Sequence, residues 1–260
     1  MSYTVFGFLS TLGLFFGMLI LLEVGWRIGI RRMTDDADGE HASVGSIESA
    51  VFGLLGLIVA FTFSGATTRF DARRQLIVEE TNAIGTAYLR VDLLAPGAQP
   101  ALRENFRRYL DARLGVYQKL PDIDAAKAEL AKANKLQGEI WRQALAASRA
   151  ADAHPDTAKL MLPAINQMID ITTTRTMATQ MHPPTIIFVM LFGLALASAL
   201  LAGYGMAGGK YRSWLHKICF AVVVAVAVYV ILDVEYPRLG LIRVDAFDQA
   251  LVELRESMGK

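Results

Sequence analysis

One run of residues constrains this chain more than any other feature. Residues 49–68, SAVFGLLGLIVAFTFSGATT, carry no charged side chain and no proline. About 20 apolar residues in a helix cross a hydrocarbon core of roughly 30 Å. The run continues without a proline into residues 69–94, which are polar but keep apolar residues at helical spacing. We therefore predict an integral membrane protein in which one helix crosses the bilayer and extends into water.

Three further charge-free runs are long enough to be membrane spans: residues 1–22, 183–209 and 218–232. The last reaches spanning length if Trp214 and Lys217 lie at the membrane interface. The chain is 53% hydrophobic and 20% charged, and its mean hydropathy is +0.36. These values are typical of several membrane spans interrupted by a hydrophilic domain.

Residues 69–182 form that hydrophilic insert, and its pattern is helical throughout. Four helical stretches are predicted, over residues 69–94, 101–120, 123–151 and 156–180. Proline-containing segments separate them, and Asp122 and Asp156 are expected to cap the helices that follow. Pro163 falls inside the last stretch. An apolar stripe on the first stretch is predicted to pack against other residues: Ile77, Thr81, Ile84, Tyr88 and Val91.

The predicted fold class is an all-α membrane protein. Four transmembrane helices form two hairpins, and a helical extramembrane domain is inserted between the second and third. The corresponding domains are residues 1–68 (first hairpin), 69–182 (extramembrane domain continuous with the second span), 183–236 (second hairpin) and 237–260 (C-terminal tail).

Several function classes find no support in the residue pattern. A net charge of +1 and the lack of a long basic run with interleaved aromatics argue against nucleic-acid binding. Cys219 is the single cysteine, so neither an intrachain disulfide nor a cysteine metal cluster is expected. The four histidines are scattered, and no catalytic motif is found. We expect no catalytic residues, no metal site, no cofactor and no enzymatic activity.

Residues 53–94, beginning GLLGLIVAFTFSGATTRF, and the segment LDVEYPRLGLIRV at 232–244 carry a family resemblance. They resemble the bestrophin-like family of bacterial integral membrane proteins of unknown function and, more remotely, the bestrophin anion channels. The remote resemblance implies a pentamer with four membrane helices per subunit, a helical cytosolic portion and a second helix that lines the pore with a hydrophobic neck. The calcium-clasp residues of bestrophins are not identifiable here, so calcium gating is not expected.

The second span offers candidates for such a pore. Leu55, Val59 and Phe63 follow one another at helical spacing and would form the neck, with Ser64 and Thr68 as the polar mouth. The alternative is ordinary helix packing, because apolar residues in a membrane helix need no special function.

Small residues on the same span support that alternative. Gly56 and Ala60 belong to a stripe that recurs every fourth residue and would let another helix approach closely. The stripe does not say whether the neighbouring helix belongs to the same chain or to another copy.

Charged residues follow the second and fourth spans. Arg69 and Arg73 would form a cationic collar that raises the local concentration of anions. The alternative is that these arginines anchor the helix end at the lipid headgroups or form ion pairs. Asp233 and Glu235 close the fourth span on the same side of the membrane and are the candidate partners.

Basic residues flank both sides of the membrane equally, so the positive-inside rule gives no preference. The charge around the first span favours an outside N-terminus, whereas the resemblance places the extramembrane domain in the cytoplasm. We expect a multi-pass protein of the cell inner membrane with a cytoplasmic domain.

The leading functional hypothesis is a homo-oligomeric, bestrophin-like ion channel that conducts small inorganic anions such as chloride. Its partners would be the lipid bilayer, further copies of itself and those anions, with no nucleic acid. The alternative is a non-conducting membrane scaffold or sensor whose helical domain binds a protein partner.

Overall fold

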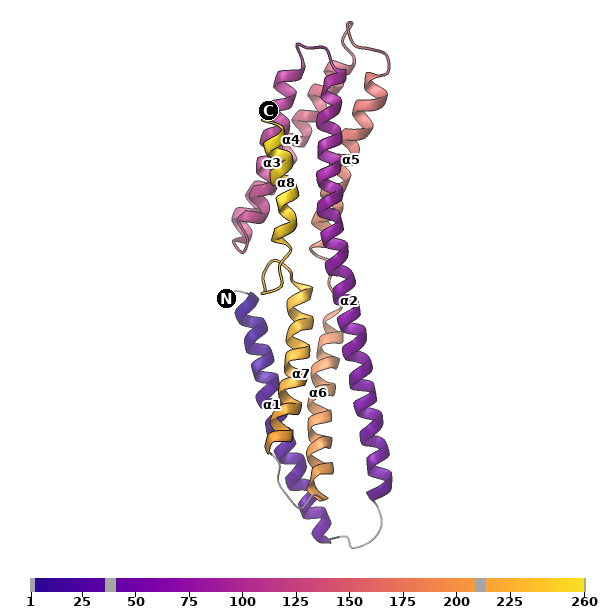
Figure 1. Cartoon of the computed structure of the whole chain (residues 1–260), viewed down its shortest axis with the longest axis vertical. Helices are drawn as coiled ribbons and strands as arrows, with labels where there is room; N and C mark the ends of the chain where they lie inside the picture. Colours follow the sequence, from indigo (N-terminus) through magenta and orange to yellow (C-terminus); the bar gives the residue numbers. More distant parts are fainter. Residues whose placement is uncertain (1–2, 36–40, 209–213, 260) are drawn as a thin grey trace. The chain divides into compact units, whose positions relative to one another are not determined.

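The computed structural model describes residues 3–35, 41–208 and 214–259, and within them every regular element is a helix. The elements are α1 (Tyr3–Asp35), α2 (His41–Leu89), η1 (Arg90–Leu93), α3 (Gln99–Gln118), α4 (Ile123–Ser148), α5 (Thr157–Ala178), α6 (Thr185–Gly205), η2 (Met206–Gly208), α7 (Trp214–Glu235), η3 (Asp245–Asp248) and α8 (Gln249–Ser257) (Figure 1). The all-α prediction is therefore confirmed for this part of the chain.

Four of these helices are long and apolar enough to cross a membrane, as predicted: α1, α2, α6 and α7. The loops that would close the two predicted hairpins include residues 36–40 and 209–213, which lie outside the described residues. The hairpin arrangement therefore stays a prediction.

The chain divides into two compact units. The membrane unit comprises residues 1–69 and 182–242, and the second unit comprises residues 70–181 and 243–260. Helix α2 contributes to both units, because it runs unbroken from His41 to Leu89. The C-terminal helix α8 belongs to the second unit together with α3, α4 and α5.

In the membrane unit, α1 packs against α6 and α7. Two glycines mark the place where α1 and α6 touch at backbone distance. A Cβ added at Gly25 would lie 2.0 Å from the carbonyl oxygen of Leu200, and one at Gly203 would lie 2.1 Å from that of Leu22. Any larger side chain would force these helices apart, so glycine is required at both positions.

The second unit is a helical bundle with its own apolar core. The predicted stripe packs into the bundle: Ile77, Ile84 and Tyr88 of α2 and Val91 of η1 are buried, and Thr81 of α2 is half-buried. Phe106 and Leu110 of α3 and Met168 of α5 belong to the same core. The stripe therefore finds its partners within the chain.

The two predicted helix caps have different outcomes. Asp122 caps α4, because its Oδ1 accepts a hydrogen bond from the backbone N–H of Ala125 at 3.0 Å. The prediction for Asp156 is wrong: its side chain makes no cap hydrogen bond at the start of α5. Its backbone has helical angles rather than the extended conformation of a capping residue, and its carboxylate accepts from Lys159 Nζ at 3.0 Å.

Candidate functional site

Helix α2 is the least covered of the four candidate spans. In its apolar stretch, 11% is buried by the rest of the chain, against 28% in α1, 28% in α6 and 44% in α7. A membrane helix with so little cover from its own chain presents most of its surface to lipid, to water or to another copy. This surface is the candidate functional site in the membrane unit.

The outward face of α2 carries the small residues. Gly56, Ala60 and Ser64 are exposed, whereas Leu55 and Ala66, roughly half a helical turn away, are buried. A Cβ added at Gly56 would meet no atom within 4 Å among the described residues. The stripe predicted to pack against a helix therefore has no close helix of its own chain over it.

The predicted neck residues do not share one surface. Leu55 is 5% exposed and is covered by its own chain, so it does not reach the outward face. Phe63 is 43% exposed, and Val59, on the flank of the helix, is half-buried. The assignment of Leu55 to the neck stays a prediction; spacing along one helix does not reveal which face the rest of the chain covers.

The predicted mouth residues Ser64 and Thr68 are both exposed. The hydroxyl of Thr68 donates to the carbonyl oxygen of Ser64 at 2.8 Å, one turn back along α2. Its oxygen therefore keeps lone pairs directed away from the helix, while its proton is used inside it.

The end of the span is held by an ion pair. Arg69 Nε lies 3.0 Å from Glu235 Oε1, and Arg69 Nη2 lies 2.6 Å from Glu235 Oε2. His182 Nδ1 lies 2.9 Å from Glu235 Oε1. The Glu235 side chain has no exposed surface, whereas that of Arg69 is 31% exposed. The structure thus brings Arg69 and Glu235 together and largely neutralises the arginine.

Arg73 lies in the second unit and has a different role from that of an open cationic collar. Its Nε donates to the carbonyl of Ala178 at 3.1 Å, and its Nη2 donates to that of Met181 at 2.9 Å. These carbonyls belong to the end of α5 and the residues just after it, where unpaired carbonyls favour a cation. This contact has no local signal in the sequence, because the partners lie 105 and 108 residues away.

The ion pair expected for Asp233 is replaced by backbone contacts. Its carboxylate accepts hydrogen bonds from the N–H groups of Leu241 at 2.9 Å and Ile242 at 2.7 Å. A Cβ at Gly240 would lie 2.0 Å from Asp233 Oδ1, so only glycine fits beside this carboxylate. Asp233 therefore fixes the turn that follows α7 rather than an arginine of α2.

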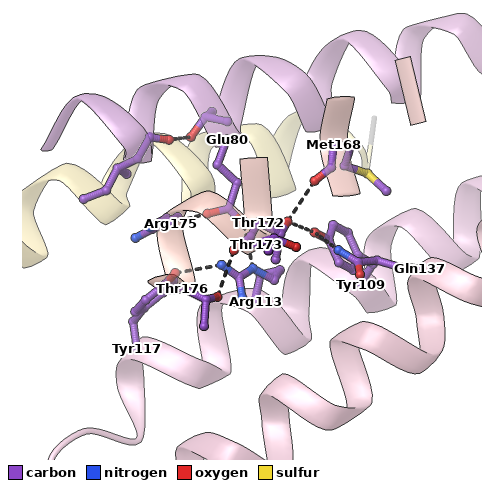
Figure 2. Close-up of polar contacts among 12 residues, drawn as sticks. Glu80, Tyr109, Arg113, Tyr117, Gln137, Met168, Thr172, Thr173, Arg175 and Thr176 are labelled. Carbon is purple, nitrogen blue, oxygen red and sulfur yellow. Dashed lines mark hydrogen bonds and ion pairs between the residues drawn. The ribbon is translucent and has the colours of Figure 1, made fainter. Parts of the chain in front are cut away.

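A buried charge cluster, which the sequence did not reveal, lies in the second unit (Figure 2). Glu80 of α2 has no exposed side-chain surface and lies between two arginines. Its Oε1 accepts from Arg113 Nε at 2.6 Å, and its Oε2 accepts from Arg175 Nη1 at 2.5 Å. Arg175 Nη2 also donates to Asp248 at 2.9 Å, which links the cluster to η3.

The charges in this cluster stabilise one another. Burial alone would raise the pKa of Glu80, but the attraction and hydrogen bonds of Arg113 and Arg175 outweigh burial and hold that pKa below its ordinary value. Burial raises the pKa of the nearby Tyr109 to about 12. The cluster therefore holds an ionised carboxylate beside a neutral phenol.

No metal-binding group of histidine, cysteine, aspartate and glutamate side chains is found among the described residues. Gly203 packs α6 against α1. The geometry described so far combines four helices that are long and apolar enough to cross a membrane with a second, separately packed helical unit.

Comparison with known proteins gives the family. The model of the Bestrophin-like domain matches residues 8–246, and the chain belongs to this family. Among curated proteins, no match is found.

Two crystal structures of a bacterial bestrophin homologue from Klebsiella pneumoniae have a similar fold. One carries a tyrosine-to-alanine mutation; it is 14% identical, and the match has a TM-score of 0.66 and covers 94% of this chain and 98% of the homologue. The other carries a tryptophan-to-alanine mutation; it is 14% identical, and the match has a TM-score of 0.69 and covers 96% and 99%. The family and the four apolar helices place the chain among multi-pass membrane proteins.

Proposed function

We propose that this protein is a homo-oligomeric ion channel whose pore is lined by α2 and conducts small inorganic anions. The observation that carries the proposal is the uncovered outward face of α2, the least buried span of the chain. If copies of the chain are arranged about a common axis, the outward faces of their α2 helices can line the same central space. The family membership and the bestrophin fold support a channel rather than another class of membrane protein.

Phe63, with Val59 beside it, would form the hydrophobic neck, and Ser64 and Thr68 the polar mouth. A ring of apolar side chains can close a pore by excluding water. Phe63 is suited to this role because its ring is substantially exposed on the single chain. Gly56 and Ala60 would let neighbouring copies of α2 approach closely above and beside the neck.

The anion preference rests on the resemblance to bestrophins rather than on local charge. Arg69 is paired with Glu235, and Arg73 donates to the carbonyls that end α5. The Arg69 side chain is 31% exposed, so it is the residue of the proposed collar that keeps accessible surface on the single chain.

The four spans would form two hairpins in the cell inner membrane, with the second unit in the cytoplasm, and a pentamer is the assembly that the resemblance favours. The competing function is a non-conducting scaffold or sensor that uses the outward face of α2 only for packing.

Flux through sealed vesicles separates the two functions. The purified protein is reconstituted into chloride-loaded liposomes, and efflux is followed against empty liposomes at several voltages and with several salts. Flux above the empty liposomes, with a reversal potential that follows the chloride gradient, supports the proposal. A reversal potential that follows the cation gradient would leave a channel but remove the anion preference. No flux under any condition supports the scaffold.

A further inference from the structure

A narrow slot lies in the membrane unit between α2, α6 and α7. Its volume is about 210 Å³, less than the roughly 300 Å³ at which small-molecule sites begin. The wall is mostly apolar and includes Ile58, Phe61, Thr62 and Gly65 of α2 and Ile187 and Phe188 of α6. Its dimensions suit a segment of one hydrocarbon chain better than a whole ligand.

The slot opens on surface that a membrane would cover. Phe61 and Met190, which belong to its lining, are 66% and 46% exposed. Both residues lie on helices that are apolar enough to span a bilayer. Acyl chains are therefore the medium that meets the slot, and burying apolar surface in it favours an apolar occupant.

One end of the slot is polar. Arg69 and Glu235 line it there, and Arg69 directly follows the charge-free run of residues 49–68. That position corresponds to the headgroup level of a membrane, where arginines contact lipid phosphates.

The guanidinium of Arg69 has one terminal nitrogen, Nη1, that does not donate to Glu235. Its Nε and Nη2 donate to Glu235. Its Nη1 lies over Gly65, because a Cβ added at Gly65 would be 3.3 Å from Nη1. Gly65 and Arg69 both line the slot, so the absence of a side chain at Gly65 leaves room beside this nitrogen. A phosphate or ester oxygen is the acceptor that such a donor binds well.

We propose that the slot binds one acyl chain of a bilayer phospholipid, with a phosphate or ester oxygen of that lipid accepting a hydrogen bond from Arg69 Nη1. The lipid would fill the space between α2 and α6 and hold the end of the α2 span beside α7. The site does not depend on ion conduction, so it stands whether or not the protein is a channel.

Photolabelling of the full chain tests the site directly. The protein is reconstituted into vesicles of phosphatidylcholine and phosphatidylglycerol that contain a trace of phospholipid with a diazirine in its acyl chain. Peptides from residues 58–69 and 183–190 should carry several-fold more label than the exposed lipid-facing positions of α7, such as Val223, and excess unlabelled phospholipid should reduce it. Label spread evenly over all lipid-facing residues would overturn the proposal.

A pair of adjacent substitutions supplies the control. Ile187→Trp fills the slot and should reduce labelling of residues 58–69 several-fold. Ile186→Trp adds the same side chain at the neighbouring position, which is 68% exposed and does not line the slot, and should leave the labelling unchanged. Equal labelling in the two variants would contradict an acyl chain in the slot. If Ile187→Trp does not fold, the labelling pattern of the wild-type protein alone tests the proposal.

Another copy of the chain is the competing occupant. To test for it, Met190→Cys is made in a Cys219→Ser background and treated with a thiol cross-linker in the same vesicles. Efficient linking of two copies through this position, together with the absence of lipid label on residues 58–69, would overturn the proposal. Lipid label without linking between copies supports it.

Discussion

Glu80 on α2 and Arg175 on α5 lie 2.5 Å apart, and the Glu80 carboxylate is fully enclosed. Arg113 donates to the other oxygen of the same carboxylate. Three helices of the second unit therefore meet at one negative charge. Removing Glu80 would leave the buried Arg113 without its carboxylate and Arg175 with Asp248 alone. Breaking a buried ion pair in this way is far more costly than losing an exposed pair.

Glu80→Gln should strongly destabilise the second unit. The substitution leaves two buried guanidinium groups facing a neutral amide, at an expected cost of about 3–5 kcal/mol. Thermal unfolding of the purified protein in detergent, followed by circular dichroism, should show an earlier transition. Glu104→Gln is the matched control, because Glu104 pairs with Arg107 on the surface. An equal shift in both variants would show that the enclosed cluster is not a special source of stability.

Acid should weaken the same cluster. The pKa of Glu80 lies below the ordinary value of 4.5 because Arg113 and Arg175 favour the carboxylate, an effect that exceeds the opposing effect of burial. The stabilising contribution is therefore complete above the unfolded pKa and is lost as the pH falls through the lower folded pKa. The transition temperature should fall in this acidic range more steeply in the wild type than in Glu80→Gln. Parallel curves would exclude Glu80 as the group that titrates.

Helix packing in the membrane unit can be tested with two glycines of the same helix. Gly203→Ala would bring a methyl group within 2.1 Å of the Leu22 carbonyl oxygen, whereas Gly193 has no atom within 4 Å of an added Cβ among the described residues. Gly203→Ala should cost about 1–3 kcal/mol by forcing α1 from α6. Gly193→Ala should be close to neutral. Thermal melting of both variants in detergent measures the difference.

The sequence predicted those features that depend on neighbouring residues. Apolar runs marked the four spans, and 3-to-4 spacing placed Ile77 and Ile84 in the core, because helical periodicity is local. Glu80 lies three residues after Ile77 and four before Ile84, so its place on the apolar stripe was a usable signal for a buried carboxylate. Its partners were not predictable, since Arg113 and Arg175 lie 33 and 95 residues away.

The candidate site shows the same division. Spacing along α2 grouped Leu55 with Phe63, but tertiary packing covers the first and leaves the second exposed. The close helix contacts that require glycine also lie between α1 and α6, whereas Gly56 of α2 makes no such contact among the described residues. The face of a membrane helix that packs against its own chain is determined by residues distant in sequence. The local sequence of α2 therefore does not identify that face.

Phe63 is the exposed aromatic residue of the proposed neck. If its ring closes a hydrophobic constriction, Phe63→Ala should widen the neck, admit water and raise chloride efflux from liposomes several-fold over the wild type. Phe16→Ala removes a comparably exposed ring from α1, outside the proposed pore, and should leave efflux unchanged. Equal protein incorporation must be verified for all three samples, because efflux scales with the number of channels per vesicle. Unchanged efflux in Phe63→Ala, in a preparation where the wild type conducts, would remove Phe63 from the neck and leave the outward face of α2 to serve in packing between copies.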